Sequence, residues 1–207
     1  MLGDAPNEAQ RGWGDVGQSF EPPEANQLQH NVAIFGHSYV ARLPLAKPKV
    51  VGAPGLIVRA FSVPGGKVST IRNHREYHEL EHFKPELTLM ILGGNDITAQ
   101  SDLQELAEEI ERLALEIEEK TGGGCKIIGI ESRTNPRGMS PDQFNRAKNG
   151  VNRRLRRSLP YSKSRFIPMS MSKEELTLAD GVHLGEAGSR KLLAFLMEQA
   201  YDYINRK

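Results

Sequence analysis

The chain has 207 residues, of which 38% are hydrophobic and 26% charged, and its formal net charge is +1. This length fits one domain with a sizeable core, and the small net charge excludes a protein drawn to nucleic acid or anionic lipid by its bulk charge. The single cysteine, Cys125, excludes an intramolecular disulfide, and we expect it to be a buried small residue.

The sequence shows no recognisable targeting signal in its N-terminal segment. Its first ten residues, MLGDAPNEAQ, lack the apolar stretch of a secretory signal, and no run in the chain approaches the ~18 apolar residues of a membrane span. We therefore expect a cytoplasmic or nuclear location, and whether the chain is whole or a fragment of a longer one is left open. Residues 1–30 are rich in Gly, Pro, Glu, Gln and Asn without periodicity, which predicts a flexible tail before a single domain over residues 31–207.

Five short apolar runs are bounded by glycine, proline or polar residues, which is typical of strands buried on both faces of a parallel sheet. Helical patterns lie between them. A stripe from Leu103 to Ile117 follows a capping box formed by Ser101 and Gln104, and Gly122 is placed to end that helix. The predicted strands are residues 32–35, 56–61, 87–92, 126–130 and 165–167.

Three more helices are expected. A weak one lies within residues 68–83, a second begins at Ser140 with Gln143 completing its capping box, and the last follows Gly185. Strands that alternate with helices predict a three-layer α/β/α sandwich around a mostly parallel five-stranded sheet. In such sheets ligands bind at the carboxyl edge of the strands.

Chemically distinctive segments follow three of these strands, and a fourth precedes the last helix. Gly36-His37-Ser38-Tyr39, Pro64-Gly65-Gly66 and Gly93-Gly94-Asn95-Asp96 stand at strand ends, and Asp180-Gly181-Val182-His183 comes before the final helix. A serine hydroxyl needs a base to become a nucleophile. His183 can be that base, and Asp180, three residues earlier, can orient the imidazole on a tight turn.

Acyl transfer also needs donors for the oxyanion that develops on attack. The backbone N–H of Ser38, the N–H of a glycine at 65 or 66, and the Asn95 side chain can supply three. Glycine suits the second position because a side chain there would crowd the oxyanion, and spacing favours Gly65 over Gly66.

The four segments, in this order, resemble the conserved blocks of the SGNH/GDSL hydrolases: VAIFGHSY, PGG, GGND and DGVH. The resemblance implies a flavodoxin-like SGNH fold and a serine esterase for small acyl esters. It also implies Ser38 as nucleophile, Asp180 and His183 as the rest of a catalytic triad, and Ser38, Gly65 and Asn95 as the oxyanion hole. No metal or organic cofactor is implied. One departure is His37, where the family usually has a supporting aspartate beside the serine. This Gly-His-Ser variant resembles SGNH domains of animal retroelement proteins.

Two alternatives remain open. The first is a catalytically inactive SGNH-fold binding module of a retroelement protein. The second is a zinc hydrolase, because residues 78–82 read H-E-x-x-H, in which His78 and His82 would bind the metal and Glu79 would be the base. Nucleic acid binding is possible but not favoured, through a basic stretch that lacks interleaved aromatic residues. That stretch contains Arg146, Lys148, Arg153, Arg154, Arg156 and Arg157.

Overall fold

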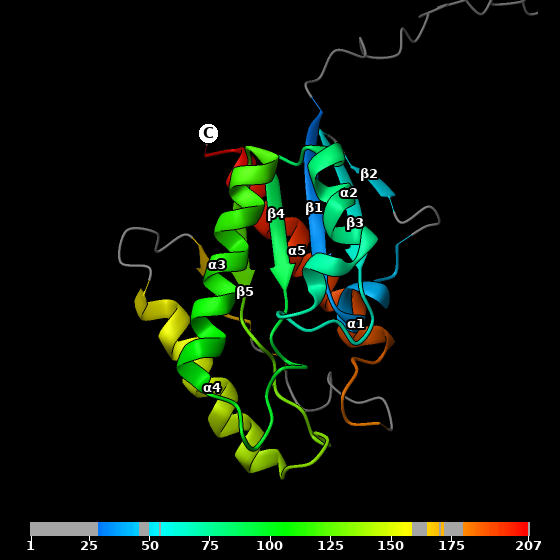
Figure 1. Cartoon of the computed structure of the whole chain (residues 1–207). Helices are drawn as coiled ribbons and strands as arrows, with labels where there is room; N and C mark the ends of the chain where they lie inside the picture. The colour runs from blue at the N-terminus through cyan, green and yellow to red at the C-terminus, as the bar shows by residue number, and fades with distance from the viewer. Residues whose placement is uncertain are drawn as a thin grey trace, which may run out of the picture.

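The structure is a computed structural model, and it describes residues 29–45, 50–53, 55–158, 165–169, 171 and 180–206. Residues 1–28, nearly all of the predicted tail, lie outside the described residues, so the tail stays a prediction. A central sheet stands between helices on its two faces (Figure 1). None of the helices in the described ranges is long and apolar enough to cross a membrane.

The sheet has six strands in the order β2-β3-β1-β4-β5-β6. All five predicted strands are present, and they run parallel to one another, which confirms the predicted mostly parallel sheet. The strands are β1 (His30–Gly36), β2 (Val50–Ala53), β3 (Leu56–Ser62), β4 (Leu87–Ile91), β5 (Gly124–Ile128) and β6 (Phe166–Ile167).

Strand β2 is the one strand that the sequence did not predict. It pairs antiparallel with β3 at the edge of the sheet. Its four residues are flanked by Pro48 and Pro54, and Gly52 interrupts them. An edge strand needs only one hydrogen-bonded neighbour, so a run this short and interrupted can pair without the continuous apolar pattern of the inner strands.

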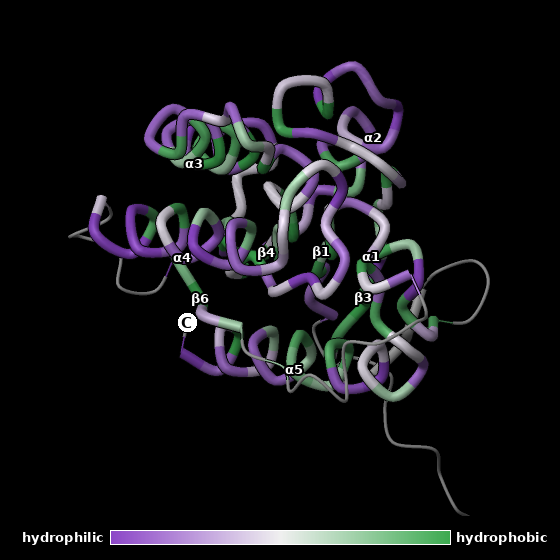
Figure 2. Tube along the Cα trace, turned by 90° about the horizontal axis from the view of Figure 1, so that it is seen from below, coloured by the Kyte–Doolittle hydropathy of each residue, from purple (hydrophilic) through white to green (hydrophobic). Residues whose placement is uncertain are grey.

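Both faces of the sheet are buried, and this explains the continuous apolar runs. Along β1, Ala33 and Phe35 belong to the core on one face, while Val32 and Ile34 belong to the core on the other. Figure 2 shows α5 on the opposite side of the strands from α2 and α3. The predicted three-layer sandwich is therefore confirmed. The helices are α1 (Ser38–Ala41), a 3-10 turn at Ile71–Asn73, α2 (Arg75–Phe83), α3 (Leu103–Thr121), α4 (Pro141–Ser158) and α5 (Glu186–Ile204).

The ends of α3 and α4 can be compared with the predicted capping residues. Ser140 and Gln143 form the expected reciprocal box at the start of α4, with distances of 2.9 and 3.2 Å, and Gly122 ends α3 at φ 71°. The box at Ser101 and Gln104 is wrong. Asp102 caps α3 instead, accepting from the Gln104 N–H at 2.8 Å, because the Ser101 hydroxyl donates to the Asp96 carbonyl oxygen at 2.7 Å.

Parallel pairing brings the carboxyl ends of β1, β3, β4 and β5 to one edge. Gly36 closes the first of them, and a Cβ at this position would overlap the carbonyl oxygen of Ile91 on β4. The absence of a side chain lets the His37 N–H donate to that oxygen at 3.2 Å. This bond fixes where the chain leaves β1, and so where Ser38 begins α1.

Candidate active site

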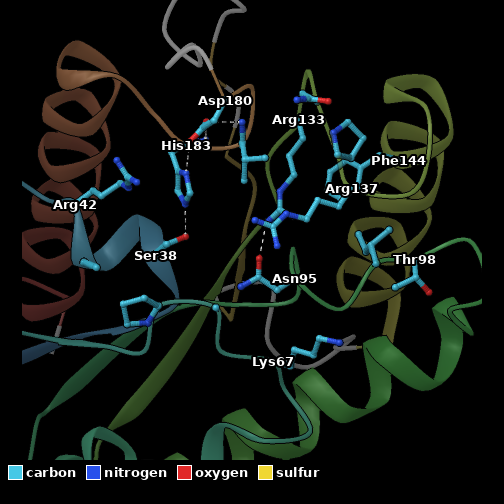
Figure 3. Close-up of a pocket in the computed structure, with 17 residues that line it drawn as sticks. Ser38, Arg42, Lys67, Asn95, Thr98, Arg133, Arg137, Phe144, Asp180 and His183 are labelled. Carbon is cyan, nitrogen blue, oxygen red and sulfur yellow. Dashed lines mark hydrogen bonds and ion pairs between the residues drawn. The ribbon is translucent and has the colours of Figure 1, made fainter.

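A pocket of about 910 Å³ opens at this edge. Ser38, Gly65, Asn95, Asp180 and His183 all line it. Figure 3 shows the side chains of Ser38, His183 and Asn95 converging on it from different segments. The structure thus brings together every side chain that the sequence singled out for acyl transfer.

Ser38, His183 and Asp180 form one hydrogen-bonded chain. His183 Nε2 lies 2.9 Å from Ser38 Oγ, and His183 Nδ1 lies 2.7 Å from Asp180 Oδ2 (Figure 3). An ionised carboxylate only accepts, so Nδ1 carries the proton and the lone pair of Nε2 faces the serine hydroxyl. In this tautomer the imidazole can accept the Ser38 proton.

The other oxygen of Asp180 holds the turn that carries His183. Its Oδ1 accepts from the N–H groups of Val182 and His183, each at 2.9 Å. The bond from His183 Nδ1 and these backbone bonds hold the pKa of Asp180 well below its usual range. The carboxylate is therefore charged at physiological pH.

Gly181, between Asp180 and His183, lets this turn pack against the loop after β5. Gly181 has φ 64°, and its carbonyl oxygen accepts from the N–H groups of Thr134 and Asn135 at 2.9 and 3.1 Å. A Cβ on Gly181 would lie 2.6 Å from Thr134 Oγ1. Tyr39 also holds the turn, because its hydroxyl donates to the Val182 carbonyl oxygen at 2.8 Å. Neither the Gly181 contacts nor the Tyr39 hydrogen bond was predicted from the sequence.

Ser38, Gly65 and Asn95 line the same pocket, and each has an N–H hydrogen without an acceptor among the described residues. Within the described residues, the N–H groups of Ser38 and Gly65 donate to no acceptor. The Gly66 N–H is engaged, because it donates to the Val63 carbonyl oxygen at 2.9 Å. This geometry favours Gly65 over Gly66, as spacing did. The amide of Asn95 donates to the Gly66 carbonyl oxygen at 3.0 Å, and in the described part of the chain its second hydrogen has no acceptor.

Arg133 is one of several polar side chains in the pocket that sequence reasoning missed. Its Nη2 donates to Asn95 Oδ1 at 2.8 Å, and its guanidinium lies 5.2 Å from the Phe144 ring centroid. It fixes which end of the Asn95 amide is the donor. Arg133 lies in the loop after β5. The sequence analysis considered the ends of β1, β3 and β4, and the same rule applied to β5 would have drawn attention to this loop.

His37 stands where the family usually has aspartate. The side chain is 3% exposed, and burial, followed by the charges of Arg133 and His183, lowers its pKa to about 3. The ring is therefore neutral at physiological pH. Its Nδ1 accepts the Tyr39 N–H at 3.3 Å and caps α1. A buried neutral imidazole thus supplies the acceptor that a short acidic side chain would offer at a helix N-terminus.

Asp96 links the loop that carries Asn95 to the backbone at Val68. Its Oδ1 accepts the Val68 N–H at 3.0 Å, while Oδ2 is buried without a partner among the described residues. Burial raises the pKa of Asp96 to about 6 from the ordinary 3.8. Between about pH 4 and pH 6 the folded protein therefore keeps a proton that the unfolded chain releases, so the free energy of unfolding falls as the pH rises through this window.

We expect Asp96→Asn to remove this loss of stability. The amide keeps an oxygen for the Val68 N–H but cannot ionise. The difference in free energy of unfolding between variant and wild type should shift in favour of the variant by about 2 kcal/mol between pH 4 and pH 7. Urea unfolding at four pH values measures it, and a difference that does not change with pH would contradict the assignment.

The H-E-x-x-H pattern on α2 lies outside this pocket, and two of its side chains, those of Glu79 and His82, make other contacts. His82 Nδ1 lies 3.1 Å from the His78 carbonyl oxygen. Glu79, the base of that hypothesis, accepts from Arg59 at 2.8 Å and from Arg75 at 2.6 Å. In the described part of the chain no group of three or more His, Cys, Asp or Glu side chains is arranged to hold a metal ion.

The basic stretch lies on α4, and three of its members contact the protein itself. The Lys148 ammonium donates to Ser132 Oγ at 2.9 Å, Arg154 donates to the Gly150 carbonyl oxygen at 3.3 Å, and Arg156 lies 5.8 Å from the Phe166 ring centroid. Arg146, Arg153 and Arg157 are exposed. Nucleic acid binding here stays an alternative that the sequence does not favour. Cys125 is buried as predicted, and burial raises the pKa of its thiol.

Solved structures with this fold include several esterases. An acetylxylan esterase from Geobacillus stearothermophilus, solved as a catalytic mutant, superposes with a TM-score of 0.60 at 17% identity, over 84% of this chain and 96% of its own. An aryl esterase from M. smegmatis gives 0.61 at 16% identity, over 84% and 99%. A carbohydrate acetylesterase from Sinorhizobium meliloti gives 0.61 at 13% identity, over 84% and 100%.

A comparison with curated proteins finds no match, whereas a comparison with family models does. The model of the GDSL-like lipase/acylhydrolase family matches residues 12–191. This span contains all four segments that line the pocket, together with the five parallel strands. The chain belongs to the GDSL-like lipase/acylhydrolase family.

Proposed function

We propose that the protein is a serine esterase for small acyl esters, with Ser38 as nucleophile, His183 as general base and Asp180 as the group that orients and stabilises the imidazole. One observation carries this proposal. It is the continuous chain of hydrogen bonds, at 2.7 and 2.9 Å, from the Asp180 carboxylate through the imidazole to Ser38 Oγ at the pocket. A surface histidine and a helix-capping serine would have no reason to meet in this way.

The first half of the reaction acylates the enzyme. His183 Nε2 takes the proton of Ser38 Oγ as the oxygen attacks the ester carbonyl carbon, and the carbonyl electron pair moves onto its oxygen. The N–H groups of Ser38 and Gly65 and the free hydrogen of Asn95 Nδ2 donate to that oxyanion. The tetrahedral intermediate then collapses, the ester C–O bond breaks, and the leaving alkoxide receives the proton from His183.

The second half regenerates the serine. Water attacks the acyl-Ser38 carbonyl carbon while His183 Nε2 takes a proton from it, and the same donors hold the second oxyanion. Collapse breaks the bond to Ser38 Oγ, which recovers its proton from His183, and the carboxylic acid leaves. The side chain of Asp180 is 44% exposed, so the site is open to solvent, which supports small esters and direct access of the hydrolytic water.

A chromogenic ester separates this proposal from its two alternatives. Hydrolysis of 4-nitrophenyl acetate should be saturable, should survive a chelator and should disappear in Ser38→Ala. Chelator-sensitive hydrolysis that persists in Ser38→Ala would instead favour a metal-dependent enzyme. A folded protein that hydrolyses no ester in a panel of acyl lengths would favour a binding module.

A further inference from the structure

The pocket around Ser38 carries an excess of positive charge. Among the described residues its lining contains four cationic side chains, Arg42, Lys67, Arg133 and Arg137, and one carboxylate, Asp180. Over the whole chain the charges almost cancel, with 27 Lys and Arg against 26 Asp and Glu. The excess is therefore a property of this pocket and does not reflect a basic protein.

The single carboxylate does not neutralise these cations. Both oxygens of Asp180 are occupied, one by His183 Nδ1 and the other by two backbone N–H groups. Elsewhere in the fold, three partly buried arginines are paired with glutamate, at 2.8, 2.7 and 2.6 Å for Arg59, Arg72 and Arg165. Among the described residues, Arg42, Lys67 and Arg137 form no such pair.

Three of the four cations belong to the side of the pocket that holds the oxyanion donors. Lys67 comes two residues after Gly65, and Arg133 is bonded to Asn95. Arg137 lines the same pocket; burial lowers the pKa of Arg133, and the positive charge of Arg137 adds to this effect. Figure 3 places Arg42 on the far side of Ser38 from this group.

Arg133 and Arg137 line the same pocket with like charges that repel each other, and Arg133 is partly desolvated, which costs free energy when no anion is bound. An anion between them would offset that cost. A guanidinium offers a planar fork of N–H donors that matches a carboxylate or a phosphate. Apolar surface from Ile97 and Phe144 lines the same pocket, so it can also take the hydrocarbon part of a substrate.

We propose that the natural substrate is an ester that itself carries a carboxylate or phosphate group, and that Lys67, Arg133 and Arg137 bind this group beside the oxyanion donors. This inference rests on the proposed esterase function and names the substrate class of the same site. An ester bound in this way has its carbonyl oxygen directed at Gly65 and Asn95 before attack.

Matched ester pairs test the preference. Mono-4-nitrophenyl adipate and its methyl ester differ by a charge on the acyl side, and 4-acetoxybenzoate and its methyl ester differ by a charge on the alcohol side. Each rate is normalised to hydrolysis by hydroxide. We expect kcat/KM for the anionic member of at least one pair to exceed that of its neutral partner by about tenfold, which is about 1.4 kcal/mol, and the preference to fall with added salt. Equal values, or lower values for the anion, in both pairs would overturn the proposal.

Charge-removing variants locate the effect. Arg137→Gln and Lys67→Gln should each lower the ratio of anionic to neutral kcat/KM by several fold. Arg153→Gln removes the same charge from the exposed face of α4 and should leave the ratio unchanged. Equal losses in all three variants would show an effect of net charge alone and would contradict a site in the pocket.

Binding to Ser38→Ala tests the anion site without turnover. Adipate and inorganic phosphate are titrated separately and followed by NMR shifts, which distinguishes a preference for carboxylate from one for phosphate. Binding that Arg137→Gln weakens and Arg153→Gln does not would support the anion site even if no ester were hydrolysed, a result that counts against the esterase alone. Ser38-dependent hydrolysis without anion binding or anionic preference would overturn the anion site and leave the esterase standing.

Discussion

Replacing His183 with alanine should lower kcat for 4-nitrophenyl acetate by a factor on the order of 10⁴ to 10⁶ while changing KM little. Among the described residues, His37 is the imidazole next to Ser38 in the chain, and it cannot replace His183 as the base because its Nδ1 already accepts the Tyr39 N–H and caps α1. The variant should fold, since the turn from Asp180 is also held by the Tyr39 hydroxyl and by the Thr134 and Asn135 N–H groups.

The matched control for this variant is His78→Ala, a histidine exposed on α2. It should keep wild-type activity, and it also tests the zinc hypothesis. A small effect of His183→Ala combined with a large effect of His78→Ala would contradict the assignment of the general base. The double variant Ser38→Ala/His183→Ala should be no slower than either single variant, because the two residues act as one unit.

Asp180→Asn should lower kcat by about 10³-fold, for a reason specific to this turn. Asp180 Oδ1 accepts two backbone N–H groups, so in the variant the amide oxygen takes that place and the NH₂ group faces His183 Nδ1. The imidazole must then accept at Nδ1 and carry its proton on Nε2, where it can only donate to Ser38. Asp202→Asn on the exposed end of α5 is the control and should be neutral.

Outside the triad, a large effect on kcat is expected at Asn95. Asn95→Ala should lower kcat by about 10²-fold or more, because it removes a donor to the oxyanion whose strength is realised only in the transition state. Asn95→Asp keeps the oxygen that Arg133 binds but replaces the donor with a second carboxylate oxygen. We expect it to be at least as slow as the alanine variant, because its charge would repel the oxyanion.

Steady-state kinetics on both variants, with Asn73→Ala at an exposed position as the control, measure this effect. A change confined to KM would mean that Asn95 contacts the substrate equally in the ground state and in the transition state. An Asn95→Asp variant with wild-type kcat would remove Asn95 from the oxyanion hole, leaving only the two backbone donors.

The layered fold could be predicted from the sequence because its strands are buried on both faces. Runs such as Leu87–Ile91, with every residue buried, leave little choice other than the inside of a parallel sheet. The edge strand Val50–Ala53 could not be predicted, because pairing with one neighbour leaves no such pattern. The cap of α3 was misassigned because Ser101 and Asp102 are both good caps, and a tertiary contact to the Asp96 carbonyl oxygen decides between them.

The candidate site was predictable to the extent that its members follow strands. Ser38, Gly65 and Asn95 stand at strand ends, and parallel topology alone collects them at one edge. The convergence of Asp180 and His183 on Ser38 depends instead on how residues 180–183 dock on the loop after β5, which no local pattern encodes. Strand order could have placed Arg133 at this edge, but its bond to Asn95 and the bond of Tyr39 to Val182 are long-range contacts that become visible only in three dimensions.

Covalent labelling with a fluorophosphonate, followed by mass spectrometry to locate the tag, tests most directly whether the Ser38 hydroxyl is activated by the imidazole. The probe needs no knowledge of the natural ester. We expect one tag per chain, on Ser38, with labelling at least about 10³-fold slower in His183→Ala and unchanged in His78→Ala. A folded protein that stays unlabelled, or a tag on another residue, would contradict the account.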